Sequence, residues 1–214
     1  MRSVSNVTCT QAMSTARTIR RFTDVPVDDA TLAACLEAAV WAPSGANMQA
    51  WRFIVLRSPE QRAVVARCAA KALEVIEPVH GMSRPDPDDD DLRSRNNRAT
   101  YELHDRAGEY TSVLFCYQWW ESASELLLGG SIYPAVQNFV LAARAQGLGV
   151  CLTSWASCDG EAMLRESVGV PDDFMLAGLA VVGWPRRGFG PLRRKPAATR
   201  TFENAWNNPT GLFG

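Results

Sequence analysis

The chain has 214 residues, of which 22 are basic and 23 acidic, so its formal charge is −1. This balance argues against a general nucleic-acid binder and against a polybasic membrane anchor, because both need an excess of positive charge. With 47% hydrophobic residues, a core is expected and global disorder is excluded. Only Lys71 and Lys195 are lysines, which leaves 20 arginines among the 22 basic residues. Codon bias produces such a skew, and so do arginines that bind a phosphate or carboxylate through the planar guanidinium.

Cysteine usage and hydropathy bear on the compartment. No stretch near the N-terminus resembles a signal peptide, and the longest apolar-rich run, Phe174 to Trp184, is too short to span a bilayer. The six cysteines contain no Cys-x-x-Cys pair. We therefore expect a cytoplasmic protein with reduced cysteines and with neither a membrane nor a nucleic acid as partner. Four cysteines lie in apolar helix or strand patterns, where a thiol behaves as a small hydrophobe: Cys35, Cys68, Cys116 and Cys151.

Hydrophobic periodicity predicts the elements of the first half of the chain. Asp28 to Ala42 has the apolar spacing of a helix, with Asp28 as N-cap and a proline just after the end. A loop follows, and Trp51 to Arg57 alternates like a strand. The sequence Ser58-Pro59-Glu60-Gln61 is typical of a capping box, so a helix is expected from there to about Ile76.

The segment from Pro78 to Asn97 differs from its surroundings in composition. It holds three prolines and five aspartates and almost nothing apolar. As a calcium-binding loop it lacks the central glycine and the terminal glutamate. The composition predicts a mobile, solvated loop, which is either a lid or an insertion.

The second half of the chain predicts three strands and two helices, followed by an irregular, basic stretch from Trp184. The longer helix is expected to begin at Ser131, since Pro134 is tolerated in a first turn. Four strands mixed with at least four helices indicate a layered α/β or α+β domain. The predicted elements are strands at Thr111 to Gln118, Gly149 to Trp155 and Phe174 to Gly183, and helices at Ser131 to Gln146 and Glu161 to Val168.

Common catalytic motifs are missing from the sequence. There is no Gly-x-x-x-x-Gly-Lys phosphate loop, no His-Glu-x-x-His pair and no Gly-x-Ser-x-Gly elbow. Gly147-x-Gly149 fails as a dinucleotide fingerprint, because position 152 is leucine and the motif follows a helix. A dispersed Ser/His/Asp triad stays open, although no pattern favours it. If the chain is an enzyme, its reactive group is expected to come from a bound cofactor.

Three segments of the sequence carry side chains suited to binding a phosphate and a heterocycle. In Ala16 to Phe22, the side chains of Arg17, Thr18 and Arg20 are spaced to converge on one phosphate through charge-assisted hydrogen bonds. The loop from Ala42 to Trp51 carries three polar side chains that suit the amide edges of a heterocycle, and Leu192 to Pro196 is a basic cluster. The alternatives are a basic surface loop, an ordinary turn and a solvated run of charge.

Jointly these stretches resemble the nitroreductase family of flavin mononucleotide (FMN) enzymes. That family has, in order, an Arg-Arg-Ser-x-Arg-type motif, Ala-Pro-Ser-Gly-x-Asn-x-Gln-Pro-Trp, a helix ending in Gly-Leu-Gly, Gly-Tyr-Pro and Arg-Lys-Pro. Each motif is weak alone, but their order holds from about residue 14 to 200. The matching stretches are Ala16 to Arg20, Ala42 to Trp51, Ala135 to Asn138 leading to Gly147-Leu148-Gly149, Gly183-Trp184-Pro185 and Arg194-Lys195-Pro196.

The resemblance implies roles for particular residues. Arg17, Thr18 and Arg20 would contact the phosphate and ribityl chain, with Arg20 reaching toward the pyrimidine, and Arg194 would complete the phosphate site. Ala16 stands where the family has an arginine, which implies a lower affinity for FMN. Ala50 replaces the usual proline, which loosens its loop. The family also implies flavin contacts by Pro43, Ser44, Asn47 and Gln49, typically to the flavin bound mainly by the partner subunit, and by Leu152, Thr153 and Ser154, where backbone amides face its reactive edge.

The same resemblance implies a fold and a reaction. The fold would be an α+β layered sandwich with a mostly antiparallel central sheet flanked by helices, in an intertwined homodimer whose C-terminal segment reaches over the partner. Residues 1–214 would form a single FMN-binding domain with an N-terminal extension (1–13), a flexible acidic loop (78–97) and a C-terminal tail (197–214). NADPH or NADH would reduce flavin N5 by hydride transfer in a ping-pong cycle, and a nitroaromatic or quinone-like acceptor would then be reduced, with no catalytic side chain.

Two other functions stay open. Relatives in this family reductively dehalogenate aromatics or use oxygen to fragment the flavin, and the segment from about Pro78 to Leu128 would decide between the reactions. In this segment, Trp119 and Trp120 either stack on an aromatic acceptor or belong to the hydrophobic core. Of these alternatives we expect the core. The third function is a non-catalytic flavin-binding or storage protein, which the substitution at Ala16 makes conceivable.

Overall fold

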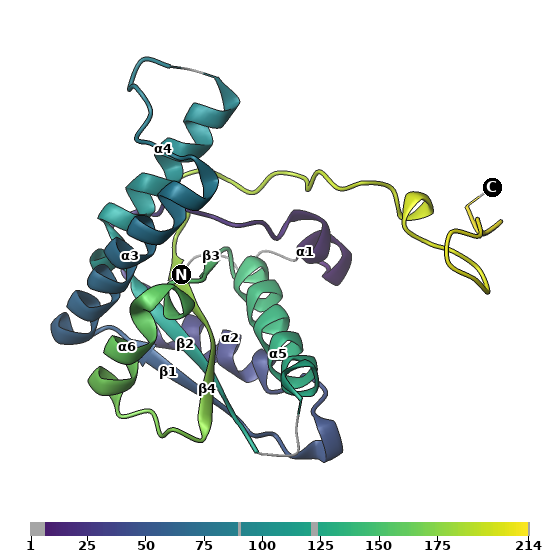
Figure 1. Ribbon diagram of the computed structural model, residues 1–214, viewed down its shortest axis with the longest axis horizontal. Helices are drawn as coiled ribbons and strands as arrows, with labels where there is room; N and C mark the ends of the chain where they lie inside the picture. Colours follow the sequence, from purple (N-terminus) through teal and green to yellow (C-terminus); the bar gives the residue numbers. More distant parts are fainter. Residues whose placement is uncertain (1–6, 90, 121–123, 214) are drawn as a thin grey trace.

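The centre of the computed structural model, which describes residues 7–89, 91–120 and 124–213, is a four-stranded antiparallel sheet in the order β1-β2-β4-β3. The central strands β2 and β4 have continuous apolar runs, as expected for strands covered on both faces. This sheet and its flanking helices confirm the predicted α+β class (Figure 1). The strands are β1 (Trp51–Leu56), β2 (Thr111–Gln118), β3 (Gly149–Thr153) and β4 (Phe174–Gly183).

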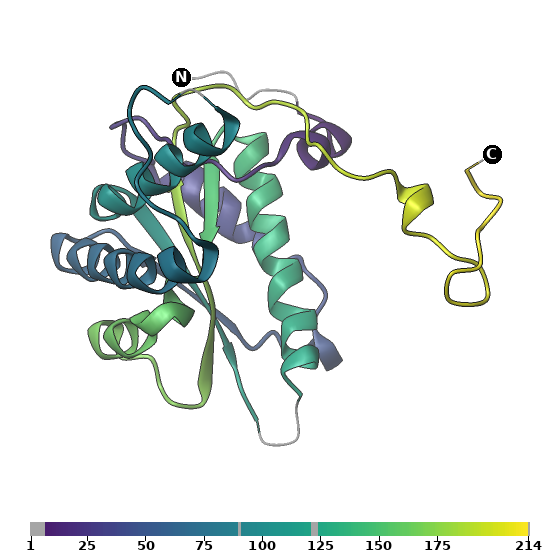
Figure 2. The same ribbon diagram turned by 45° about the horizontal axis from the view of Figure 1, so that its top comes forward.

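Helices cover both faces of the sheet (Figure 2). Because neighbouring residues of a strand point to opposite faces, β2 contributes Leu114 and Cys116 to one hydrophobic core and Val113 and Phe115 to the other. The first core includes side chains of α3 (Pro59–His80), α4 (Leu92–Asp105) and α6 (Glu161–Val168), and the second includes side chains of α2 (Asp29–Ala39) and α5 (Glu125–Ala145).

Local sequence signals set several boundaries. The side chains of Asp28 and Ser58 each accept a hydrogen bond from a backbone amide three residues later, and they start α2 and α3 as predicted. Gly169, with φ of +67°, ends α6 in the left-handed conformation that glycine adopts without strain. The predicted bounds of β2, α6 and β4 are confirmed, whereas α2 and β3 end earlier than expected, at Ala39 and Thr153.

Both predicted bounds of the loop from Pro78 to Asn97 are wrong. α3 continues to His80, and α4, which the sequence analysis missed, begins at Leu92. Asp91 caps α4, since its carboxylate accepts hydrogen bonds from two backbone amides of the first turn. A carboxylate at this position stabilises a helix N-terminus, so part of the acidic character that indicated a solvated loop is a helix-start signal.

α5 corrects a second expectation. It begins at Glu125, capped by Ser124, so Pro134 lies inside the helix and not in its first turn. The buried side chains of Leu128 and Ile132, one turn apart, show that packing extends the helix toward its N-terminus. By length and composition α5 is apolar enough to cross a membrane. Its inward side chains belong to the second core, however, which is typical of the central helix of a globular domain.

The chain segment after α1 (Cys9–Thr15), a second helix that was not predicted, runs along the free edge of β3. Thr18 forms a parallel bridge with Val150, and the Ile19 amide donates a hydrogen bond of 3.0 Å to the Val150 carbonyl. Gly149 permits this approach, because a Cβ atom there would lie 2.8 Å from the Cβ of Ile19. The contact fixes the segment that carries the first group of predicted phosphate ligands.

The described part of the C-terminal tail extends away from the body of the molecule (Figure 1). Its apolar side chains are largely uncovered: Trp206 is 85% exposed and Leu212 is 78% exposed. The tail contains a short 3-10 turn at Ala197–Thr199 and a second turn closed by a bridge between Phe202 and Pro209. In this conformation the tail does not pack on its own domain.

Candidate functional site

A cavity of about 860 Å³ lies between the N-terminal segment, α4 and the chain that follows β4. Arg17, Thr18, Arg20 and Arg194, which are far apart in the sequence, all line it. The Leu192 amide donates a hydrogen bond of 3.0 Å to the Ser14 carbonyl, and this bond holds the two basic stretches side by side. The structure therefore brings together all four residues expected to contact the phosphate end of FMN.

The charge of this cavity suits an anion. Arg193 also lines it, and no aspartate or glutamate is among its described lining residues. Arg17 and Arg20 form no ion pair with any described residue, and Arg194 donates to the Arg193 carbonyl at 3.0 Å. Guanidinium groups that face a cavity without a carboxylate are suited to charge-assisted hydrogen bonds with phosphate. Elsewhere in the described part of the chain, ion pairs with carboxylates are formed by Arg21, Arg57, Arg84, Arg106, Arg165 and Arg186.

α4 supplies lining residues that the sequence analysis missed. Leu92, Asn96 and Thr100 are spaced by four and share one face of the helix, and all three line the cavity together with Asn97. The same spacing was visible in the sequence, but the acidic composition favoured a loop. Amide and hydroxyl groups beside the arginines provide polar partners for a ligand that carries more than a phosphate.

The loop at residues 43–50 lies at the other end of the sheet. Through strand pairing, the start of β1 is level with Met175 of β4, whereas Thr18 is level with Val182. From 175 to 182 is seven residues of β4, or roughly 23 Å at the rise of a strand. One chain therefore does not bring this group of predicted residues to the cavity: Pro43, Ser44, Asn47 and Gln49.

Internal hydrogen bonds give that loop a defined conformation. The Ser44 hydroxyl accepts a hydrogen bond of 2.8 Å from the Gln49 amide and lies 3.4 Å from the hydroxyl of Tyr117. The Gln49 side chain donates to the Asn47 side chain at 2.9 Å. Ala46 and Gln49 have φ of +49° and +48°, values that cost energy for residues with a side chain. Such strain is stored at functional sites when the surroundings enforce it.

Leu152 and Thr153 are the last residues of β3, the strand that Thr18 bridges, and Ser154 follows directly after it. Leu152 is 43% exposed, and the Thr153 hydroxyl is engaged, since it donates 2.9 Å to the Leu179 carbonyl. β3 is an edge strand, so alternate backbone amides face away from the sheet. This is the orientation that the predicted contact with the flavin edge requires.

Trp155 connects this segment to α4. Its indole nitrogen donates a buried hydrogen bond of 2.9 Å to Nε2 of His104. Nδ1 of His104 therefore carries the ring proton and donates to the Thr100 carbonyl at 2.8 Å. Burial lowers the pKa of His104, and the positive charge of Arg20 acts in the same direction. A neutral histidine thus joins the cavity-lining helix to the end of β3.

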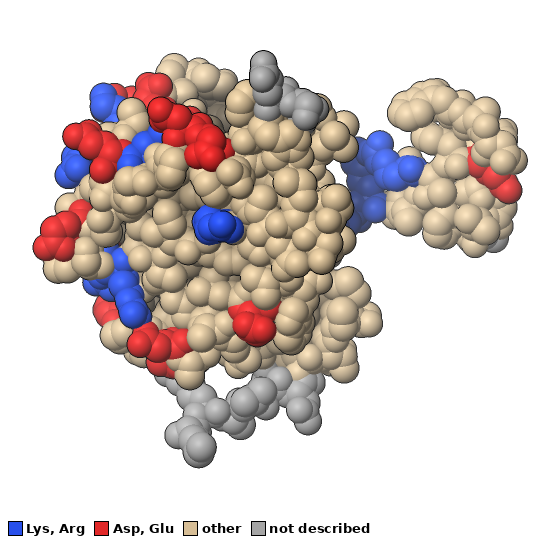
Figure 3. Space-filling model, turned by 90° about the horizontal axis from the view of Figure 1, so that it is seen from below, with Lys and Arg blue, Asp and Glu red and all other residues tan. Residues whose placement is uncertain are grey.

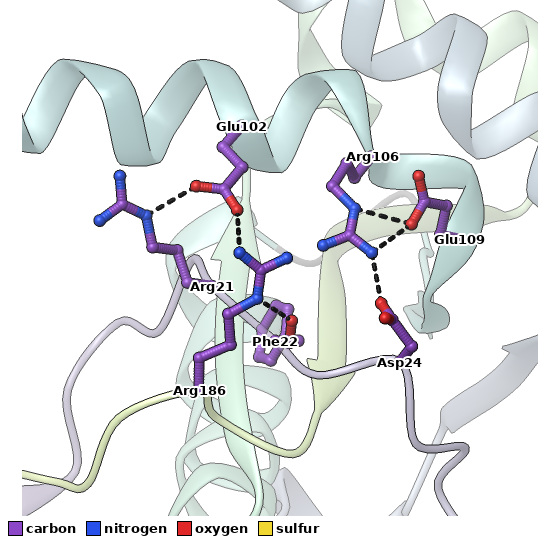
Figure 4. Close-up of polar contacts among 7 residues, drawn as sticks. All are labelled: Arg21, Phe22, Asp24, Glu102, Arg106, Glu109 and Arg186. Atoms are coloured by element: carbon purple, nitrogen blue, oxygen red, sulfur yellow. Dashed lines mark hydrogen bonds and ion pairs between the residues drawn. The ribbon is translucent and has the colours of Figure 1, made fainter. Parts of the chain in front are cut away.

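A polar network also holds α4 to the segments beside it (Figure 4). The Glu102 carboxylate accepts hydrogen bonds from Arg21 at 2.7 Å and from Arg186 at 2.6 Å. Arg186 donates a further bond of 2.8 Å to the Phe22 carbonyl. Three parts of the chain that border the cavity are therefore fixed relative to one another.

Comparison with known proteins identifies the family to which the chain belongs. The family model described as Nitroreductase family matches residues 13–184, and the chain belongs to this family, as its motifs predicted. The 5,6-dimethylbenzimidazole synthase of Rhodospirillum rubrum is 29% identical over 184 residues, which cover 79% of this chain and 78% of the relative.

Solved structures share the fold. An FMN- and NADPH-dependent nitroreductase from Sphigopyxis sp. strain HMH superposes with a TM-score of 0.68 at 20% identity, over 93% of this chain and 100% of that one. Iodotyrosine deiodinase bound to FMN and 3-iodo-L-tyrosine gives a TM-score of 0.68 at 20% identity, over 88% and 96% of the two chains. At these identities the likeness establishes the fold, and family membership rests on the family model.

Proposed function

We propose that this chain is an FMN-dependent oxidoreductase that takes electrons from NADPH or NADH and passes them to a small electron-poor acceptor, such as a nitroaromatic or a quinone. The observation that carries the proposal is a cavity that Arg17, Arg20 and Arg194 all line and that has no carboxylate among its described lining residues. Its volume of about 860 Å³ falls in the range typical of cofactor sites. Membership of the nitroreductase family supports FMN as the ligand.

The chain's own residues would bind and orient the cofactor, while bound FMN supplies the redox chemistry. Arg17, Thr18 and Arg194 would hold the phosphate by charge-assisted hydrogen bonds. Arg20 would place a positive charge near the pyrimidine, where electrostatic stabilisation favours the reduced, anionic ring. The edge amides of residues 152–154 would face the reactive end. This division of labour needs no catalytic side chain and agrees with the absence of catalytic motifs from the sequence.

The test is spectroscopic. The protein, purified and loaded with FMN, is expected to show a flavin spectrum that bleaches rapidly when NADPH or NADH is added anaerobically. Initial rates with a quinone acceptor are expected to give parallel double-reciprocal lines. Failure to bind FMN under any loading condition would contradict the proposal, and intersecting lines would contradict the ping-pong order. Bound flavin that responds to neither nucleotide would instead support a storage protein.

We also propose a homodimer as the functional unit. The loop at residues 43–50 and the cavity lie at opposite ends of the sheet, so a second copy is needed to bring the two groups of predicted ligands to one flavin. The tail extends away from its own domain with Trp206 and Leu212 exposed. On the face shown in Figure 3, uncharged residues cover most of the surface, and most charged side chains lie on the side away from the tail. Such a surface and such a tail fit an interface with a partner.

Replacing Trp206 and Leu212 together with alanine is expected to raise the dimer dissociation constant at least tenfold, because both side chains would lose apolar contacts with the partner. Sedimentation velocity over a range of protein concentrations measures the change. Val79→Ala is a matched control, since Val79 is 71% exposed at the end of α3. A folded, FMN-loaded monomer of the unaltered protein in dilute solution would contradict the dimer.

A second candidate reaction uses the same fold and cofactor. The likeness to a 5,6-dimethylbenzimidazole synthase and to iodotyrosine deiodinase favours oxygen-dependent flavin fragmentation or reductive dehalogenation. Trp120 packs against the second core, as expected, whereas Trp119 is 45% exposed and belongs to neither core. Exposed Trp119 is thus available to stack on an aromatic substrate. Admitting oxygen or a halogenated phenol to the reduced protein, and following loss of flavin or release of halide, separates these reactions from nitro or quinone reduction.

The state of the cysteines supports a reducing, cytoplasmic location. All six are free, and Cys35, Cys68, Cys116 and Cys151 are buried. Burial raises the pKa of the Cys35 thiol to about 12 and that of Cys116 and of Cys151 to about 11, and it also raises the pKa of Cys68. These four thiols therefore stay protonated and act as small apolar groups.

A further inference from the structure

A second cavity, of about 500 Å³, adjoins the proposed cofactor cavity. Arg95 of α4 and Arg187 and Gly188 of the chain after β4 line the second cavity and not the first. The two cavities are therefore neighbouring compartments along one stretch of the N-terminal segment. The residues that line both are Arg17, Thr18, Arg20, Leu92 and Asn96.

The second cavity has its own excess of positive charge. Among its described lining residues one is a carboxylate, Glu102, and it already accepts hydrogen bonds from two arginines (Figure 4). Arg95 and Arg187 form no ion pair with any residue that the structure describes. The nearby aspartates Asp89 and Asp91 instead accept hydrogen bonds from the Ser94 hydroxyl, at 2.6 and 2.9 Å. The arginines that line the cavity are Arg17, Arg20, Arg21, Arg95, Arg186 and Arg187.

Arg95 and Arg187 are positioned by separate, well-fixed parts of the chain. Arg95 lies in the first turns of α4, and its amide donates 3.0 Å to the carbonyl of the capping Asp91. Arg187 follows Arg186, whose amide donates 3.0 Å to the Arg21 carbonyl while its side chain bonds to Glu102. A binding site whose backbone is fixed in advance loses less entropy when a ligand arrives.

We propose that Arg95 and Arg187 bind the 2′-phosphate of NADPH and so make the protein prefer NADPH to NADH, an inference that rests on the proposed reductase function. FMN has a single phosphate, for which Arg17 and Arg194 already provide two guanidinium groups. The second compartment is left for another strongly charged anion. NADPH differs from NADH by one phosphomonoester, which is close to doubly charged at neutral pH. Two guanidinium groups match such a group in charge and hydrogen-bond geometry.

The first experiment compares the two nucleotides as substrates. Replacing Arg95 and Arg187 together with alanine is expected to raise KM for NADPH at least tenfold more than KM for NADH, with FMN content unchanged. Arg67→Ala is the matched control, because Arg67 is exposed on α3 and has no ion pair among the described residues. It is expected to change neither KM. A similar rise in both KM values, or no rise in either, would overturn the inference.

The second experiment measures binding without any redox step. Calorimetry compares adenosine 2′,5′-bisphosphate with 5′-AMP on the purified, FMN-treated protein. The bisphosphate is expected to bind at least tenfold more tightly, and the difference is expected to vanish in the double variant. Equal affinities would overturn the inference even if both nucleotides reduce the flavin. If the protein binds the bisphosphate selectively but NADPH does not reduce its flavin, the reductase function would be overturned, whereas the proposed anion site would be supported.

Discussion

The protein with both Arg17 and Arg194 replaced by alanine is expected to bind FMN at least a hundredfold more weakly than the unaltered protein. A hydrogen bond between charged groups contributes about 1.5–3 kcal/mol. Losing two corresponds to about 3 kcal/mol or more, which is over two powers of ten in affinity. Neither side chain forms an ion pair with a described residue, so the fold is expected to be retained.

Fluorescence titration of FMN into the apoprotein measures this loss, and circular dichroism shows whether the double variant is folded. Arg67→Ala removes one exposed arginine of α3 and is expected to leave the dissociation constant within twofold. If the double variant keeps FMN as tightly as the unaltered protein, the phosphate does not bind in this cavity. Loss of binding in the control as well would point to a general effect of net charge.

The second large effect is a loss of folding stability, expected when His104 is replaced. Replacing it with phenylalanine removes the acceptor to which the buried indole N–H of Trp155 donates. An unsatisfied buried donor costs about 1–3 kcal/mol, so the free energy of unfolding is expected to fall by that amount. His104→Gln keeps an oxygen acceptor and is expected to be less destabilising. Urea unfolding followed by tryptophan fluorescence measures both variants, and an unchanged midpoint for the phenylalanine variant would show that the bond does not stabilise the fold.

His104 also predicts how stability depends on pH. The folded protein holds its pKa below the ordinary value of 6.5, chiefly through burial. As the pH falls below 6.5, the unfolded chain therefore binds a proton that the folded chain does not, and stability decreases, by at most about 1.4 kcal/mol per pH unit. The pKa values of Asp28, Asp91 and Asp105 are also lowered, but from 3.8, so they act in a more acidic range.

Urea midpoints at pH 7.5, 6.5 and 5.5 test this dependence. The unaltered protein is expected to lose stability across the series, and His104→Gln is expected to lose less. Parallel curves for the two proteins would show that another group is responsible.

The elements predicted most accurately are those whose bounds depend on local chemistry. The apolar runs of β2 and β4 and the terminal Gly169 of α6 lie within short windows of sequence, and the structure agrees with their predicted bounds. α4 was missed because composition outweighed periodicity: Asp91 counted as part of a charged loop, although it caps a helix. The start of α5 was missed because only tertiary packing, around Leu128, extends that helix.

For the candidate site, too, local sequence motifs identified the residues, whereas their arrangement in space depends on long-range contacts. Motif order identified the residues around Arg17 and Arg194, but their proximity depends on long-range contacts, such as the one between Leu192 and Ser14, that no short window contains. Strand register, also a long-range property, separates the loop at residues 43–50 from the cavity. The second compartment was not predicted, because Arg95 and Arg187 acquire significance only when α4 and the chain after β4 lie side by side.

The N-terminal segment beside β3 carries residues of the proposed phosphate site and also covers an edge of the sheet. β3 is the last strand of the sheet, and its outer edge is covered at Val150 by Thr18 and Ile19. An uncovered edge strand is a template for pairing with other chains. The residues that would hold the phosphate lie in the same short stretch that covers this edge. A ligand bound to that stretch would therefore also hold it in place against β3.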